Sequence, residues 1–212
     1  MSNKAISFLQ SNRRLKSQIL SEIFEYKNEL QKIKILDLGS SSESHIQKIS
    51  NKLKELILMD INFLNLNKKK GITYIEGDVR NIENLFKENS IDIIIAIDLV
   101  EHLSKSDSIL FIKKIKKICK RKVIIYTPNG FLPQPPDPNN PFQEHKCGYT
   151  NSELKKLGFK TSGMIGLKNL RGSYHALKKP VLINFILSKV TTIFTRHLFK
   201  NLDSAIFAVY KK

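Results

Sequence analysis

Short apolar runs recur along this chain, and they constrain its fold more than any other feature. The runs occupy residues 34–38, 56–60, 73–75, 91–97 and 122–126. Short runs without alternating polar residues are typical of parallel strands that are buried between two layers of helices. Strands that alternate with helices through short connections build a doubly wound sheet. The sequence therefore predicts an α/β fold with helices on both faces of a mostly parallel sheet.

The remaining segments complete this prediction. Helices are expected at residues 43–52, 81–88, 105–119 and 150–157, with Thr150 and Glu153 forming a capping box in the last of them. A strand near 159–165 and a final antiparallel strand over 204–210 would close the sheet. Residues 1–30 are expected to form an N-terminal helical extension, and 167–203 a helical insertion before the last strand. We expect a single domain over residues 1–212.

Cysteine content, hydropathy and charge narrow the class of protein. Cys119 and Cys147 are the two cysteines, too few for a disulfide framework. The N-terminus lacks the apolar stretch of a signal peptide, and no run is long enough to span a membrane. These features predict a reduced, cytoplasmic protein. The net charge is +17, but the lysines are scattered, which favours a solvated basic surface over RNA or an anionic membrane as a partner.

Polar residues follow the predicted strands at the edge where ligands of such sheets bind. Gly39 follows the first strand, and a tight turn there would present backbone N–H groups at a helix N-terminus. Asp60 ends the second strand, 21 residues later, where an acid can accept both hydroxyls of a ribose. Asp78 follows the third strand and could receive an adenine amino group. Asp98 ends the fourth strand.

Five motifs in register carry a family resemblance. They are Leu36-Asp-Leu-Gly39, Leu58-Met-Asp60, Glu76-Gly-Asp78, Asp98-Leu-Val-Glu-His102 and Tyr126-Thr-Pro-Asn129. In this order they resemble the class I S-adenosylmethionine-dependent methyltransferases, and are most similar to the branch that includes ubiquinone-biosynthesis O-methyltransferases. The resemblance implies a Rossmann-like domain with S-adenosylmethionine as cofactor. It implies that the cofactor-binding residues are Asp37, Gly39, Ser41, Asp60, Ile61, Asp78, Val79 and Asp98.

The first loop departs from that family's pattern. Ser41 and Glu43 stand at positions where the family usually has further glycines. A dinucleotide-binding dehydrogenase would need those glycines for its pyrophosphate, so the departure disfavours that class. It also leaves open a degenerate domain that binds a partner without catalysis.

Two histidines are the candidate catalytic residues. Methyl transfer from a sulfonium depends mainly on positioning, but a hydroxyl acceptor also needs a base. His102 and His145 can serve because imidazole titrates near neutral pH. A structural role for either is the alternative. Glu101 could join both histidines around a divalent cation, as in some relatives of the family, but their spacing is not specific for metals and we expect none.

The acceptor site is predicted less directly. The proline-rich loop 130–148 and the insertion 167–200 are expected to form it together, with Arg171 and His175 as anion contacts. Residues 176–200 combine apolar and basic side chains, a pattern that can contact a membrane surface peripherally. A packed helical lid or a dimer face is the favoured alternative for this stretch.

These features predict an O-methyltransferase acting on a small-molecule or lipid-linked acceptor. The positive charge suggests an RNA methyltransferase as the alternative, although Asp98-Leu-Val-Glu101 is not the Asn/Asp-Pro-Pro-aromatic motif of amino-methylating enzymes. Nucleic acid is therefore not the favoured partner.

Overall fold

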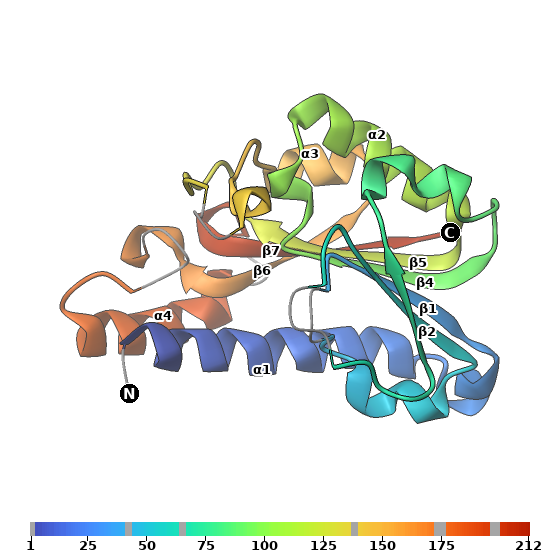
Figure 1. Cartoon of the computed structure of the whole chain (residues 1–212). Helices are drawn as coiled ribbons and strands as arrows, with labels where there is room; N and C mark the ends of the chain where they lie inside the picture. The colour runs from blue at the N-terminus through green and yellow to red at the C-terminus, as the bar shows by residue number, and fades with distance from the viewer. Residues whose placement is uncertain (1–2, 41–43, 64–66, 137–139, 172–176, 196–199) are drawn as a thin grey trace.

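The computed structural model describes residues 3–40, 44–63, 67–136, 140–171, 177–195 and 200–212. It contains a seven-stranded sheet with the order β3-β2-β1-β4-β5-β7-β6 (Figure 1). The strands are β1 (Lys34–Leu38), β2 (Glu55–Asp60), β3 (Ile72–Glu76), β4 (Ile91–Ile97), β5 (Cys119–Pro128), β6 (Lys160–Leu167) and β7 (Asp203–Lys211). Strands β1 to β5 pair in parallel, while β7 is antiparallel to β5 and β6. The predicted fold class is confirmed.

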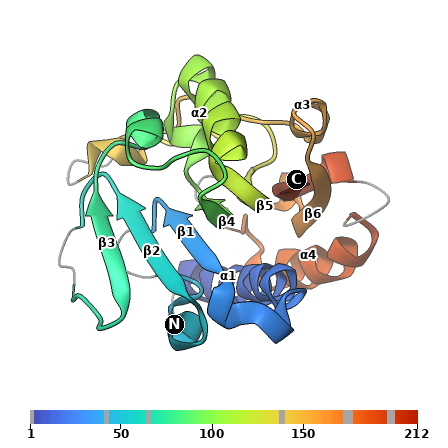
Figure 2. The same ribbon diagram turned by 90° about the vertical axis from the view of Figure 1, so that its right-hand side faces the viewer.

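Four α-helices cover the two faces of the sheet. They are α1 (Asn3–Phe24), α2 (Lys105–Ile118), α3 (Asn151–Lys156) and α4 (Val181–Thr195). Figures 1 and 2 show α1 and α4 on one face and α2 and α3 on the other. Successive side chains of a strand point to opposite faces of the sheet. Ile35 belongs to the core cluster that contains Ile19 of α1, whereas Leu36 belongs to the cluster that contains Ile112 of α2. Burial on both faces explains why the strands are continuous apolar runs.

Two of the predicted helices are shorter than expected. Residues 43–52 and 81–88 were expected to be helical, but the described residues form 3₁₀ helices at Gln47–Lys52 and Val79–Asn84. In the second, the Asp78 carboxylate accepts a hydrogen bond from Arg80 N, and the backbone kinks at Asn81. Further 3₁₀ helices lie at Lys27–Lys32, Val100–His102, Pro141–Gln143, Lys168–Leu170 and Lys200–Leu202.

A buried lysine joins α1 to the sheet. Lys122 of β5 is fully buried, and its Nζ lies 2.6 Å from Glu22 Oε2 and 2.7 Å from Glu25 Oε2. Both glutamates belong to α1 or the residue after it. A buried ammonium needs such partners, so this ion pair holds α1 against the sheet as one of its covering layers.

Candidate active site

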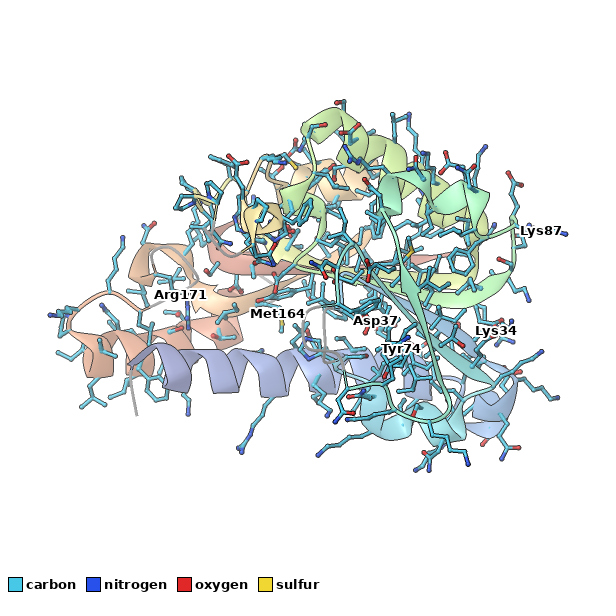
Figure 3. The ribbon with its side chains drawn as sticks, in the orientation of Figure 1. Lys34, Asp37, Tyr74, Lys87, Met164 and Arg171 are labelled. Atoms are coloured by element: carbon cyan, nitrogen blue, oxygen red, sulfur yellow. The ribbon has the colours of Figure 1, made fainter. Side chains whose placement is uncertain are left out.

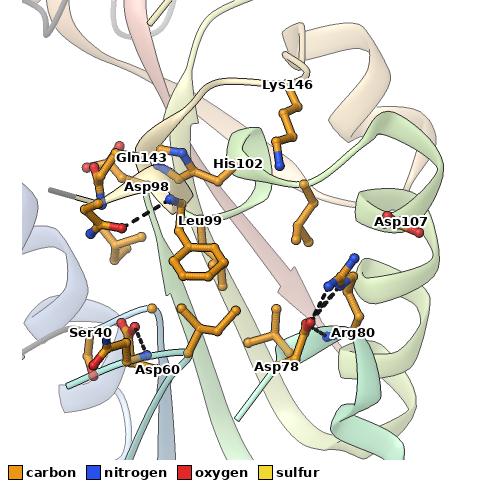
Figure 4. Close-up of a pocket in the computed structure, with 18 of the residues that line it drawn as sticks. Ser40, Asp60, Asp78, Arg80, Asp98, Leu99, His102, Asp107, Gln143 and Lys146 are labelled. Carbon is orange, nitrogen blue, oxygen red and sulfur yellow. Dashed lines mark hydrogen bonds and ion pairs between the residues drawn. The ribbon is translucent and has the colours of Figure 1, made fainter. Parts of the chain in front are cut away.

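The carboxyl ends of the first four strands meet at a cavity of about 700 Å³. Figure 4 shows Asp60 and Asp78 on one side of the cavity, with Asp98, His102, Gln143 and Lys146 on the other. The cavity is lined by Asp37, Gly39, Ser40, His45, Asp60, Ile61, Asn62, Asp78, Val79, Arg80, Ile97, Asp98, Leu99, His102, Leu103, Ser104, Asp107, Asn140, Pro141, Phe142, Gln143 and Lys146. The predicted residues Asp37, Gly39, Asp60, Ile61, Asp78, Val79, Asp98 and His102 therefore share one cavity. Ser41 lies outside the described residues.

Backbone hydrogen bonds from neighbouring strands fix this edge of the sheet. Gly39 N donates to Met59 O at 2.8 Å, and Asp98 N donates to Tyr126 O at 2.9 Å. Gly39 has φ +69°, and a Cβ there would meet the Leu99 side chain at 3.1 Å. Asp98 itself has φ 46°, a left-handed conformation that non-glycine residues adopt at a cost and that clusters at functional sites. Glycine is therefore required at position 39, and Asp98 is held with its side chain at the cavity.

Asp37 is a buried carboxyl, and none of the described residues places a cationic side chain beside it. It is 3% exposed, and its Oδ2 accepts a hydrogen bond from Ser44 Oγ at 2.5 Å. Burial raises the pKa of Asp37 to about 7, and the Ser44 bond offsets this only in part. Because Asp37 also lines the cavity, it is suited to receive a positively charged group from a ligand.

Asp37→Asn is expected to stabilise the ligand-free protein at pH 8. The raised pKa means that the wild type loses stability as the pH rises from about 4 to about 7, because the unfolded chain ionises first. The amide can still accept the Ser44 bond. We expect a gain of at least about 1 kcal/mol, or roughly 2–4 °C in Tm, at pH 8 and almost none at pH 4. Thermal unfolding across this range measures it, and a variant that melts below the wild type at pH 8 would contradict the assignment.

Asp60 and Asp78 differ in how they are already bonded. Asp60 Oδ1 accepts from Asn62 N at 3.1 Å at the end of β2. Asp78 accepts from Arg80 N at 2.9 Å and also pairs with the Arg80 guanidinium (Figure 4). These hydrogen bonds from Arg80 lower the pKa of Asp78. The Asp78 carboxylate is therefore already paired with a cation inside the cavity.

A second acid follows β4 three residues after Asp98. Glu101 is 1% exposed, and its Oε2 accepts from Thr127 Oγ1 at 3.0 Å. Among the described residues, its Oε1 has no partner other than the carboxyl of Asp98, with which Glu101 can share a proton. Burial raises the pKa of Glu101 well above its usual range, and the negative charge of Asp98 raises it further. Burial also raises the pKa of Asp98, although its side chain remains accessible from the cavity. Two acids so close favour a shared proton or a cation between them.

His102 and His145 lie together beside Glu101. Their ring centroids are 4.9 Å apart, and His102 lines the cavity whereas His145 lies behind it. His102 Nδ1 donates to Glu144 O at 3.0 Å, and His145 Nδ1 donates to Leu132 O at 2.7 Å. A carbonyl oxygen only accepts, so both neutral rings carry their lone pair on Nε2. Burial lowers the pKa of both imidazoles, which keeps them neutral near pH 7.

Glu101, His102 and His145 form a group that could hold a metal ion. One ligand atom from each lies within 4.8 Å of the others. Ring N–H groups that donate to backbone carbonyls are the usual outer contacts of metal-binding histidines. The sequence expectation that this group holds no metal stays a prediction.

The loop after β5 brings His145 to this position. Gly130 N donates to Tyr149 O at 2.8 Å, which closes the loop, and Lys146 N donates to Glu101 O at 2.8 Å. Sequence spacing could not reveal this contact, because His145 follows Glu101 by more than forty residues. Asn140 to Gln143 and Lys146, from loop 130–148, line the cavity.

The predicted contribution of the insertion to the acceptor site was wrong for the residues that the structure describes. None of the described residues of 167–200 lines the cavity. Arg171 Nε donates to Ile165 O at 3.2 Å, and Arg171 also bonds Ser188 Oγ of α4. Figure 3 shows Arg171 and Met164 on the face with α1 and α4, whereas His145 lies beside Glu101. The second expected anion contact, His175, lies outside the described residues.

Known proteins share both sequence features and the fold with this chain. Residues 36–127 match the family model described as a methyltransferase domain. A search of curated protein sequences returns no match. A SAM-dependent methyltransferase from Archaeoglobus fulgidus is 15% identical with a TM-score of 0.56, over 93% of this chain and 94% of that chain. The methyltransferase domain of a bacterial Hen1 protein is 14% identical with a TM-score of 0.56, over 95% and 100%.

A third solved structure extends the comparison. Magnesium protoporphyrin IX methyltransferase from Synechocystis PCC 6803 is 13% identical with a TM-score of 0.50, over 74% of this chain and 71% of that chain. At such identities the likeness establishes a shared fold.

Proposed function

We propose that this chain, whose residues 36–127 match a methyltransferase domain, uses S-adenosylmethionine to methylate a hydroxyl oxygen of a small-molecule or lipid-linked acceptor. The observation that carries the proposal is the group of Glu101, His102 and His145 next to the cavity at the carboxyl edge. Such a group can bind and deprotonate a hydroxyl, which transfer to the more nucleophilic nitrogen of a neutral amine would not need.

The cavity fits the cofactor. Its volume of about 700 Å³ lies in the range of small-molecule sites. Asp60 can accept the ribose hydroxyls, and the buried Asp37 carboxyl can accept the ammonium of the methionine end. Ile61 and Val79 offer apolar walls for the adenine. When bound, the cofactor supplies an activated methyl group on its sulfonium.

Glu101, His102 and His145 also fit a divalent cation. Two neutral imidazoles, together with a Glu101 carboxyl that would ionise on binding a cation, suit borderline ions such as Mn²⁺ or Zn²⁺. A bound cation would act as a Lewis acid that lowers the pKa of the acceptor hydroxyl. The chain's own contribution is to fix both rings through Glu144 O and Leu132 O and to hold Glu101 through Thr127.

The role of His145 as general base remains a proposal within this scheme. Its Nε2 lone pair is available in the neutral tautomer, but the ring does not line the cavity itself. It acts most directly as a partner of His102, whose ring it touches edge to face.

Methylation of RNA is the second candidate, and the net charge of +17 favours it.

Acceptor assays separate the two candidates. Labelled cofactor is incubated with catechols, polyprenylated phenols and short RNA, and transfer to nitrogen or to RNA alone would overturn the proposed acceptor. A domain that has lost catalysis would label none of them.

Removal of divalent cations is expected to lower methyl transfer at least 100-fold, because hydroxyl activation would be lost. EDTA-treated protein is assayed before and after addition of Mn²⁺, with binding of S-adenosylhomocysteine as the control. Binding should be unchanged and activity restored. Full activity in EDTA would exclude the cation and leave the histidines as bases.

A further inference from the structure

Helix α4 exposes its apolar side chains. Leu182 is 71% exposed, and Ile183, Ile186, Leu187 and Val190 are each more than 40% exposed. Their spacing places all five on one face of the helix. Contiguous exposed apolar residues of this kind mark surfaces that bind a partner or a membrane.

The inward face of α4 is made of small polar residues. Ser188 and Thr192 are each 4% exposed, and Ser188 Oγ donates to Ile165 O of β6 at 2.7 Å. Thr192 Oγ1 donates to Ser188 O at 2.5 Å. Gly166 lies against both, in a space that a Cβ would fill. The orientation is therefore fixed by close contacts, and the helix cannot turn its apolar face toward the core.

Basic residues surround the apolar stripe. Lys178 and Lys179 are exposed just before α4, and Lys189 is exposed on the helix with its Nζ 4.8 Å from the centre of the Phe185 ring. The sequence has no acidic residue between Glu153 and Asp203. Helix α1 lies beside α4 in Figures 1 and 2. The apolar stripe is thus bordered by positive charge that no acidic residue of this segment offsets.

We propose that α4 binds an anionic lipid bilayer, lying in the plane of the membrane surface with Leu182, Ile183, Ile186, Leu187 and Val190 in the lipid. Apolar residues bordered by lysines match the acyl chains and negative headgroups of such a surface. No helix in the described part of the chain is long and apolar enough to cross a membrane. Self-association through this face would bring its lysines against one another, which disfavours a dimer.

Vesicle sedimentation tests the proposal. The full chain is mixed with phosphatidylcholine vesicles or with vesicles that also contain phosphatidylglycerol. We expect binding to the anionic vesicles that weakens with added salt, and little binding to the neutral ones. Equal binding to both, or none to either, would overturn the proposal.

Matched variants assign the binding to α4. Leu182→Gln/Ile186→Gln should lower vesicle affinity at least tenfold, since two apolar side chains leave the lipid. Lys178→Gln/Lys179→Gln should lower it roughly 10- to 30-fold on anionic vesicles only. Leu110→Gln on α2, at a residue that is 52% exposed, is the control and should change it less than twofold. All the substituted side chains are exposed, so circular dichroism should be unchanged.

The oligomeric state tests whether α4 binds a second copy of this chain instead of a membrane. Light scattering should find a monomer in the absence of lipid. A dimer that Leu182→Gln/Ile186→Gln dissociates would overturn the proposal in favour of a second copy of this chain. These measurements use no methyl acceptor, so their results do not depend on whether the proposed methyltransferase activity is correct.

Discussion

Glu101→Gln is expected to lower methyl transfer by roughly 10²–10⁴-fold while leaving cofactor affinity nearly unchanged. Glutamine retains the shape of the side chain and can still accept the Thr127 hydrogen bond. It cannot lose a proton and become the anionic ligand that a cation would need beside the nitrogens of His102 and His145. Cation binding should be lost together with turnover, because both depend on this ligand.

Asp92→Asn is the matched control for this variant. Asp92 is 5% exposed and lies at the opposite end of β4, where it accepts from Lys34 N and pairs with Arg121. The same chemical change there should cost stability but alter turnover less than threefold. If Glu101→Gln retained Mn²⁺ binding and full turnover, Glu101 would have only a structural role.

Asp60→Ala is expected to weaken cofactor binding by roughly 10²–10⁴-fold, and Asp78→Ala by only about tenfold. Asp60 can accept two charge-assisted hydrogen bonds from ribose, each worth about 1.5–3 kcal/mol. Asp78 is already bonded to the backbone and guanidinium of Arg80, which leaves capacity for one ligand contact. Calorimetry with S-adenosylhomocysteine measures both, and equal dissociation constants would count against the ribose assignment.

The residues at the carboxyl edge of the sheet could be predicted from the sequence, because each strand end is visible in a few consecutive residues. Asp37, Gly39, Asp60 and Asp98 follow apolar runs, and in a parallel sheet the ends of such runs must meet at one edge. The helices expected at 43–52 and 81–88 were harder to predict, since a few apolar residues at helical spacing also suit short 3₁₀ helices.

The remaining features depend on contacts between segments distant in sequence. His145 reaches Glu101 only because the loop closes through Gly130 and Tyr149. The position of α4 depends on Gly166 and Ser188, whose close contact no periodicity reveals. A helix with one apolar face was therefore assigned to the acceptor site, although the structure exposes that face elsewhere.

Titration of the protein with S-adenosylmethionine and S-adenosylhomocysteine tests the central claim most directly, because it needs no knowledge of the acceptor. We predict binding of one molecule per chain at the cavity of Asp37 and Asp60, and loss of that binding in Asp60→Ala. The absence of heat and of any thermal shift at millimolar concentrations of both ligands would contradict the claim that this chain is a methyltransferase.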